Sequence, residues 1–143
     1  MIVVLDASVV LKWLLQDLKW EAGTEKATRL MESVTSGEQS VLEPMHWLAE
    51  VGAVLARESQ ATAADDVAML CALELPVADP TFVLPRACDL AIELKQHVFD
   101  TLYHAVALET PDAVLITADE RYARAAMRKG RLVHLMNWQF SKP

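Results

Sequence analysis

Four acidic residues are placed so that their carboxylates can do chemistry together. Two follow short apolar runs of strand length and two lie in segments with helical spacing: Asp6, Asp119, Glu50 and Asp100. Clustered acids repel one another unless a cation joins them, and no basic residue is near most of these four in sequence. Oxygen ligands alone favour a hard ion, Mg²⁺ or Mn²⁺, over zinc. Because such an ion activates water and neutralises charge on a phosphoryl group, the set predicts metal-dependent phosphoryl chemistry.

Taken singly, three of these acids have a purely structural explanation. Asp6, Asp100 and Asp119 each precede or open a segment with helical spacing, where an aspartate commonly caps the helix by accepting backbone hydrogen bonds. Glu50 differs, because it interrupts the apolar helical segment 45–57. A carboxylate on a buried face costs on the order of several kcal/mol unless a cation or metal pairs with it. The four residues therefore indicate a metal site mainly as a set.

These acids need a scaffold that brings distant parts of the chain together. Short apolar runs alternate with segments of helical spacing, which is typical of a parallel sheet covered on both faces. Ligands of such sheets collect outside the carboxyl ends of the strands, where Asp6 and Asp119 are expected. The strands we expect are 2–5, 40–42, 76–78, 113–117 and 131–135.

The remaining segments predict helices. Pro44 can open a helix, since its missing N–H costs nothing in the first turn, and Gly130 closes the last one. The helices we expect are 7–16, 21–34, 45–57, 62–74, 85–96, 100–109 and 120–129.

Composition limits the class of protein. A chain of 143 residues with 53% hydrophobic content suits one compact domain. A net charge of −7 and a pI near 5.0 count against a broad basic face for nucleic acid. This objection weakens if several acids converge on a divalent cation, because the bound ion reverses the local field that a phosphate meets. Lys12, Arg121 and Arg124 either contact phosphates beside the acids or lie on solvated helix faces.

The N-terminal segment 1–16 is apolar, but it has no basic leading residues and is broken by Asp6, Ser8 and Lys12. We therefore expect neither a secretory signal nor a membrane span, and a soluble, cytoplasmic protein. Cys71 and Cys88 fall in apolar helical stretches, and we interpret them as buried thiols rather than a disulfide.

The ordered motifs around the four acids resemble those of PIN-domain proteins, especially VapC-type toxins. The resemblance covers nearly the whole chain and lies in Val4-Leu5-Asp6-Ala7-Ser8 with Lys12-Trp13, Leu48-Ala49-Glu50-Val51, Phe99-Asp100-Thr101-Leu102-Tyr103 and Ile116-Thr117-Ala118-Asp119. It implies that residues 1–143 form a single PIN domain, an α/β fold of three layers (α/β/α) with a short, mostly parallel, five-stranded sheet.

The resemblance also implies an activity. It implies Mg²⁺- or Mn²⁺-dependent cleavage of RNA by metal-activated water, and silencing by a cognate antitoxin; we expect a homodimer. Asp6 and Asp100 would be the principal metal ligands. Glu50 and Asp119 would complete the pocket by orienting water or holding a second ion, and the hydroxyls of Ser8 and Thr117 would support them.

Two other functions stay open. The family often has an asparagine three residues after the glutamate, where this chain has Ala53, so a catalytically weak PIN-fold interaction module is one alternative. An aspartyl phosphatase or phosphoacceptor domain also places an aspartate after its first strand. That alternative is weaker, because position 8 is Ser8 rather than a second acid and no aspartate ends the second strand.

Several other residues have plainer interpretations. His46 and His104 each lie four residues from a proposed acid, but an oxygen-ligand site needs neither, so we interpret them as partly buried helix histidines. Trp13, Trp47 and Trp138 can stack on bases, and we interpret them as core or interface residues instead.

Overall fold

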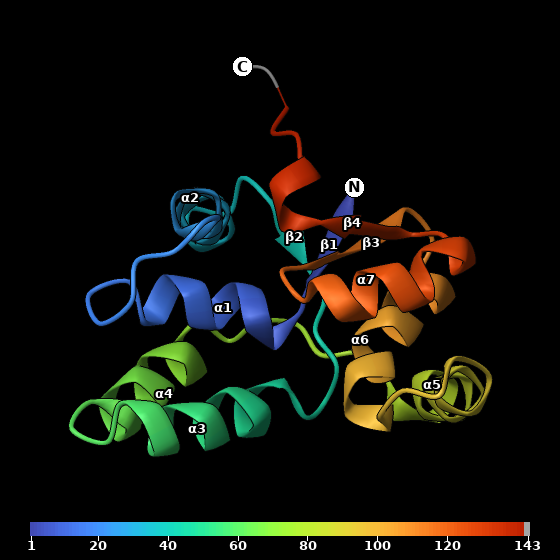
Figure 1. The fold of residues 1–143 in the computed structure, drawn as a ribbon, viewed down its shortest axis with the longest axis horizontal. Helices are drawn as coiled ribbons and strands as arrows, with labels where there is room; N and C mark the ends of the chain where they lie inside the picture. Colours follow the sequence, from blue (N-terminus) through green and yellow to red (C-terminus); the bar gives the residue numbers. More distant parts are fainter. Residues whose placement is uncertain (142–143) are drawn as a thin grey trace.

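A parallel sheet forms the centre of the fold. The computed structural model describes residues 1–141. In this part of the chain four strands, in the order β2-β1-β3-β4, all run parallel (Figure 1). They are β1 (Ile2–Leu5), β2 (Ser40–Val41), β3 (Ala113–Thr117) and β4 (Leu132–His134). The parallel α/β architecture expected from the alternating pattern is thus confirmed.

The expectation of a fifth strand at 76–78 is wrong. This segment makes only an isolated bridge between Val77 and Glu43, with Glu43 donating to Pro76 O at 2.9 Å and Ala78 donating to Glu43 O at 2.9 Å. Pro44 follows Glu43 directly, and neither Pro44 nor Pro76 has an N–H to extend the ladder. The pairing therefore stops after one residue, and within residues 1–141 the sheet has four strands.

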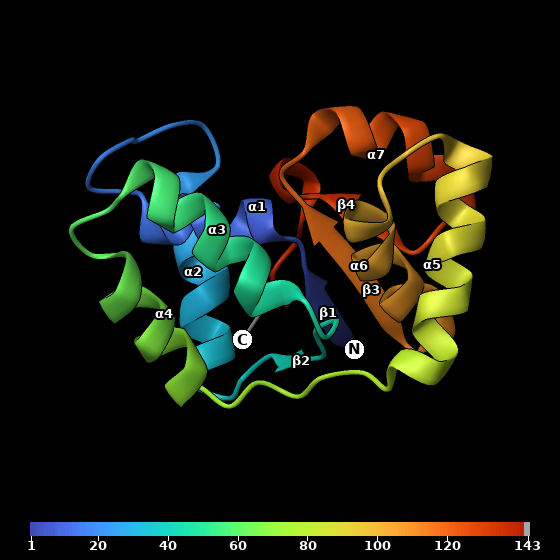
Figure 2. The ribbon, with the colours of Figure 1, turned by 90° about the horizontal axis from the view of Figure 1, so that it is seen from below.

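Helices flank the sheet. They are α1 (Ala7–Leu14), α2 (Thr24–Thr35), α3 (Trp47–Glu58), α4 (Ala63–Ala72), α5 (Pro80–Leu94), α6 (Val98–Glu109) and α7 (Glu120–Ala126), with 3₁₀ turns at Met127–Lys129 and Leu135–Asn137. Helices α1 to α4 gather on one side of β1 and helices α5 to α7 on the other (Figures 1 and 2). Helix α6 packs on β1 and β3, and α5 packs on α6.

Two helix starts differ from those expected. Helix α5 begins at Pro80 rather than near residue 85, because Asp79 accepts a hydrogen bond from Thr81 N and Pro80 suits the first helical position. Pro85 lies inside this helix. Helix α6 begins at Val98, so Asp100 lies within its first turn and does not cap it.

The core explains why the strands read as continuous apolar runs. Val3, Val4 and Leu5 in β1 are fully buried, as are Leu115 and Ile116 in β3. This burial fixes the ends of β1 and β3 side by side, with Leu5 opposite Ile116.

Two further findings concern the rest of the described chain. Cys71 and Cys88 are free thiols, as expected, but both are exposed, so the prediction of burial was wrong. None of the helices within residues 1–141 is both long and apolar enough to cross a membrane.

Candidate metal site

The first acid, Asp6, lies where β1 passes into α1. Its N–H donates to Ile116 O at 3.0 Å, which ties it to the end of β3. Its carboxylate caps α1 by accepting from the backbone N–H and the hydroxyl of Ser8. The same hydroxyl accepts from Ala118 N at 2.9 Å. Ser8 therefore joins the carboxyl ends of the two central strands and orients the Asp6 carboxylate.

The second acid, Asp119, follows β3 in the same manner. Its side chain caps α7 by accepting from Tyr122 N at 3.0 Å. Its own N–H donates to the hydroxyl of Thr117 at 3.0 Å, and Thr117 is fully buried. Both hydroxyls expected in supporting roles, those of Ser8 and Thr117, thus hold the backbone around an acid.

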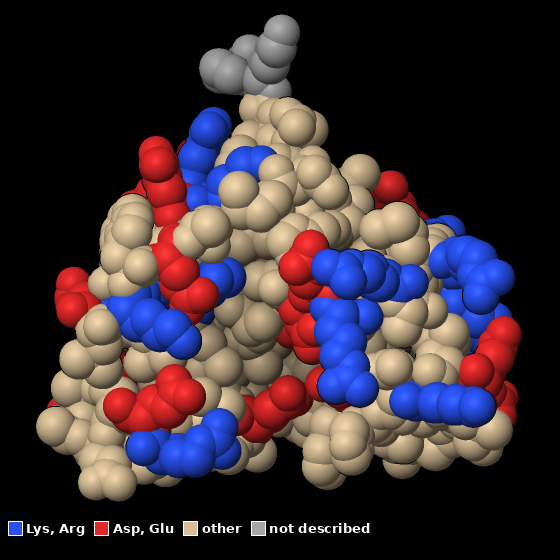
Figure 3. Space-filling model, in the orientation of Figure 1, with Lys and Arg blue, Asp and Glu red and all other residues tan. Residues whose placement is uncertain are grey.

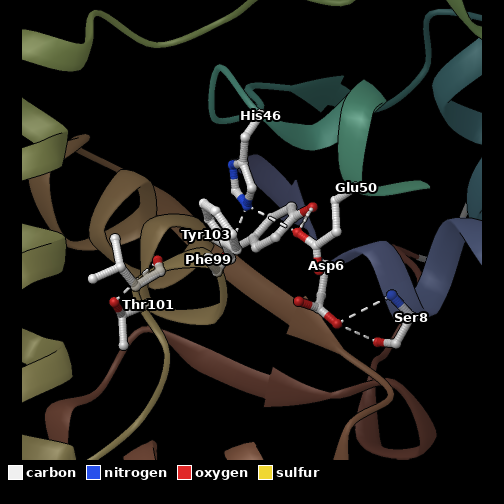
Figure 4. Close-up of polar contacts among 8 residues, drawn as sticks. Asp6, Ser8, His46, Glu50, Phe99, Thr101 and Tyr103 are labelled. Atoms are coloured by element: carbon white, nitrogen blue, oxygen red, sulfur yellow. Dashed lines mark hydrogen bonds and ion pairs between the residues drawn. The ribbon is translucent and has the colours of Figure 1, made fainter. Parts of the chain in front are cut away.

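Glu50 comes from the first turn of α3 and points toward Asp6 (Figure 4). Its Oε2 atom accepts from the Tyr103 hydroxyl at 2.9 Å and lies 2.8 Å from His46 Nε2. His46 Nε2 also lies 2.8 Å from the carbonyl oxygen of Phe99. Glu50 is therefore held on one oxygen by groups from two elements, and it is not an isolated carboxylate among apolar side chains.

The four acids act on one another electrostatically. Burial raises the pKa of Asp6 to about 6, the hydrogen bonds from Ser8 oppose that rise, and Glu50 and Asp100 add to it. The pKa of Asp100 is also raised, first by burial and then by Glu50 and Asp119. The charges of Glu50, Asp100 and Asp119 thus reach Asp6 or Asp100, which links the four carboxyls electrostatically.

Each of these acids also lies at a helix N-terminus. Asp6 and Asp119 cap α1 and α7, while Glu50 and Asp100 lie in the first turns of α3 and α6. The positive ends of these helix dipoles face the carboxylates and offset part of their repulsion. Helices α1 and α3 belong to the group α1 to α4, whereas α6 and α7 belong to the group α5 to α7. The four acids therefore lie where these two groups of helices meet (Figure 2).

The donor chemistry fits a hard divalent cation. Within residues 1–141, no Lys or Arg forms an ion pair with any of the four acids. Asp6 and Asp119 each accept their hydrogen bonds on one carboxylate oxygen, and Glu50 does the same. Each thus keeps a second oxygen for an ion. As the side chains stand, however, no three Asp, Glu, His or Cys residues of this described part are grouped to hold a metal.

A fifth acid, Glu43, was not predicted. It follows β2, is fully buried, and accepts from Leu5 N at 2.6 Å through Oε1. Its buried Oε2 has no hydrogen-bond partner in the described part of the chain. Burial raises its pKa well above the ordinary range, and Asp6 and Glu50 add to the rise. The rule that drew attention to Asp6, an acid directly after an apolar strand, applies equally to Glu43 and gives the signal that finds it.

Lys and Arg side chains lie next to Asp and Glu side chains near the middle of the face shown in Figure 3. A cavity of about 360 Å³ is lined by Lys95, Gln96, His97, Asp100, Asp119, Arg121 and Tyr122. Arg121 thus lies beside Asp100 and Asp119, where it could contact a phosphate. Lys12 pairs with Glu21 at 3.2 Å and Arg124 with Glu120 at 3.1 Å, so these two charges are already partnered.

Of the histidines and tryptophans interpreted as structural residues, some have only structural contacts and one contacts an acid of the site. His104 is fully buried, with Nδ1 3.1 Å from the Tyr122 hydroxyl and Nε2 2.8 Å from Gly130 O, and is a structural histidine. Trp47 is buried and Trp138 packs against the core, as interpreted. His46 was interpreted as a structural residue as well, but it contacts Glu50 directly.

Comparison with known proteins gives one match. The model of the PIN domain family matches residues 3–127, a range that contains all four acids. A search of curated proteins found no match to this sequence.

Proposed function

The chain belongs to the PIN-domain family, and on that basis we propose that it is a Mg²⁺- or Mn²⁺-dependent endoribonuclease, the toxin of a toxin–antitoxin pair. PIN domains are generally metal-dependent nucleases. The observation that carries the proposal is the electrostatic one. The charges of Glu50 and Asp100 raise the pKa of Asp6, and those of Glu50 and Asp119 raise the pKa of Asp100. Within residues 1–141 no Lys or Arg forms an ion pair with any of these four acids.

The proposed roles follow the contacts of each side chain. Asp6 and Asp100 would be the principal ligands, and Glu50 and Asp119 would complete the pocket. The chemistry that a divalent ion supplies in such a site is neutralisation of phosphoryl charge and activation of water. Ser8 fixes the Asp6 carboxylate, and Thr117 fixes the backbone of Asp119.

The side chains that hold the Glu50 carboxylate in place help to choose between an enzyme and an inactive interaction module. The asparagine that the family often has after the glutamate is Ala53 here. In this chain Tyr103 and His46 hold the Glu50 carboxylate instead. Because residues around a ligand fix its orientation, this pair takes over the orienting task and favours the enzyme.

The remaining parts of the proposal concern partners and setting. We propose a single domain that acts in the cytoplasm as a homodimer on RNA. We further propose that a basic segment of a cognate antitoxin inhibits it by placing Arg or Lys among the four acids, in place of the metal. Mg²⁺ or Mn²⁺ added to the complex should then weaken antitoxin binding, and affinity that ignores the metal contradicts this mode of inhibition.

The test of the enzyme is cleavage of RNA by protein rigorously freed of antitoxin. We expect cleavage that requires Mg²⁺ or Mn²⁺ and is lost in Asp6→Asn, since asparagine keeps the helix cap but removes the charge. Asp79→Asn is the matched control, because Asp79 caps α5 in the same manner at an exposed position. If the wild type cuts no RNA with either ion, the nuclease proposal fails and the interaction module takes its place.

A further inference from the structure

A large apolar side chain lies exposed beside the acidic site. Phe99 directly precedes Asp100 in the first turn of α6, and 64% of it is accessible to solvent. Its ring contributes little to the core, while the three residues that follow Asp100 are buried. The position of this aromatic ring next to a proposed metal ligand therefore needs an explanation other than packing.

The exposed ring is held in a fixed place. The ring of His46 stacks on it with centroids 5.5 Å apart and planes 23° from parallel. His46 Nε2 lies 2.8 Å from Phe99 O and 2.8 Å from Glu50 Oε2, and the His46 ring also contacts Tyr103 at 4.9 Å (Figure 4). One histidine thus links the exposed ring to an acid of the site, so the two keep a constant relative position.

Positive charge lies on the same side of the molecule. Lys95 is the C-cap of α5 and lies two residues before His97, the N-cap of α6. It lines the 360 Å³ cavity together with Arg121, Asp100 and Asp119. Within residues 1–141, neither Lys95 nor Arg121 belongs to an ion pair. Both are exposed, and so they can bind phosphates of a strand that passes the acids.

We propose that Phe99, backed by His46, is the stacking platform for an unpaired nucleobase next to the scissile phosphate, and that Lys95 and Arg121 bind neighbouring phosphates of the same strand. The inference rests on the proposed ribonuclease function and defines its substrate as a single-stranded segment. A base inside a duplex already stacks on both faces, whereas an unpaired base is free to stack on an aromatic ring.

The experiment measures binding separately from cleavage. A single-stranded RNA oligonucleotide carrying 2-aminopurine is titrated with protein in the cleavage-silent Asp6→Asn background with Mg²⁺, because stacking quenches the fluorescence of this base. Phe99→Ala should weaken binding by about 5- to 150-fold, the range for loss of one stacked base, and should abolish the quenching. Phe99→Tyr keeps a ring and should restore both, while Phe99→Leu, which is apolar but has no ring, should not.

A second exposed phenylalanine gives a matched control. Phe82 is 69% accessible and lies in α5, twelve residues before that helix ends, which is about 18 Å along the helix. Because α5 and α6 pack together and are joined by a short connection, Phe82 lies toward the far end of the pair from Phe99. Phe82→Ala should leave oligonucleotide binding unchanged. In a duplex of the same sequence the 2-aminopurine is already stacked, so added protein should cause no further quenching.

The results of these experiments distinguish failure of the Phe99 stacking proposal from failure of the nuclease proposal. Equal binding by Phe99→Ala and Phe82→Ala overturns the platform, as does full rescue by leucine. A change in sedimentation of Phe99→Ala without a change in RNA binding shows a protein contact instead. If the wild type cleaves RNA and Phe99→Ala cleaves it with the same KM, the platform fails and the nuclease stands. If quenching depends on Phe99 but no RNA is cut, the nuclease proposal fails and Phe99 is a stacking platform for an unpaired base in an RNA-binding module.

Discussion

The acidic site should destabilise the protein that contains it when no metal is bound. Asp6 illustrates the effect, because burial raises its pKa from 3.8 to about 6. Between these two values the folded protein binds a proton that the unfolded chain does not. The contribution of Asp6 to the free energy of unfolding is therefore most favourable below about pH 4 and is lost as the pH rises to 6.

The size of the effect follows from the pKa values. At 1.36 kcal/mol for each pH unit between 3.8 and about 6, an ionised Asp6 costs about 3 kcal/mol at pH 8. Asp6→Asn removes this cost, and its amide oxygen can still accept from Ser8. The variant should thus be more stable than the wild type by about 3 kcal/mol at pH 8 and by less than about 1 kcal/mol at pH 4.

Urea unfolding in EDTA at the two pH values measures this difference, provided that the slope with urea is equal for both proteins. Asp79→Asn is the control of opposite sign. The Asp79 carboxylate has a pKa lowered by hydrogen bonds from Thr81, so its neutralisation should destabilise the protein. A less stable Asp6→Asn at pH 8, or a difference that does not change with pH, would refute the proposed repulsion and burial at this site.

Two further predictions concern buried groups near the site. Glu43→Ala removes the acceptor of Leu5 N and should lower the free energy of unfolding by about 1–3 kcal/mol or more, whereas Glu43→Gln keeps an acceptor. Because the pKa of Glu43 is raised, the glutamine variant should also lose part of the fall in stability that accompanies rising pH, and parallel urea profiles for variant and wild type would contradict this. Burial lowers the pKa of His104 below its ordinary value of 6.5, so NMR spectra should show its ring titrating below that value; a ring that titrates at or above 6.5 would contradict its burial.

The fold was largely predictable because its signals are local. Runs such as Val3 to Leu5 and Leu115 to Ile116 are buried on both faces, and this burial is visible as continuous apolar sequence. The missing fifth strand shows the limit of this pattern, since residues 76–78 have the length of a strand but begin with Pro76 and pair beside Pro44, and neither proline has an N–H to extend the pairing. Helix starts were less predictable, as the cap at Asp79 and the internal Pro85 show.

The site was predictable to the extent that its residues follow strands. Asp6 and Asp119 occupy the positions expected from sequence, and both are helix caps as well. The contacts of Glu50 were not predictable, because Tyr103 lies 53 residues away along the chain. His46 was set aside because an oxygen-ligand site needs no histidine, and its spacing from Glu50 gave no sign that its other neighbour would be Phe99. Only the packing of α3 beside the start of α6 reveals this cluster.

Binding of Mn²⁺, followed by the loss of its free-ion electron paramagnetic resonance signal, tests the central claim most directly. The claim is that Asp6, Glu50, Asp100 and Asp119 form one divalent-cation site. We predict that the wild type binds Mn²⁺, that Asp6→Asn and Asp100→Asn each weaken this binding strongly, and that Asp79→Asn binds as the wild type does. Equal Mn²⁺ affinity in all four proteins would contradict the claim.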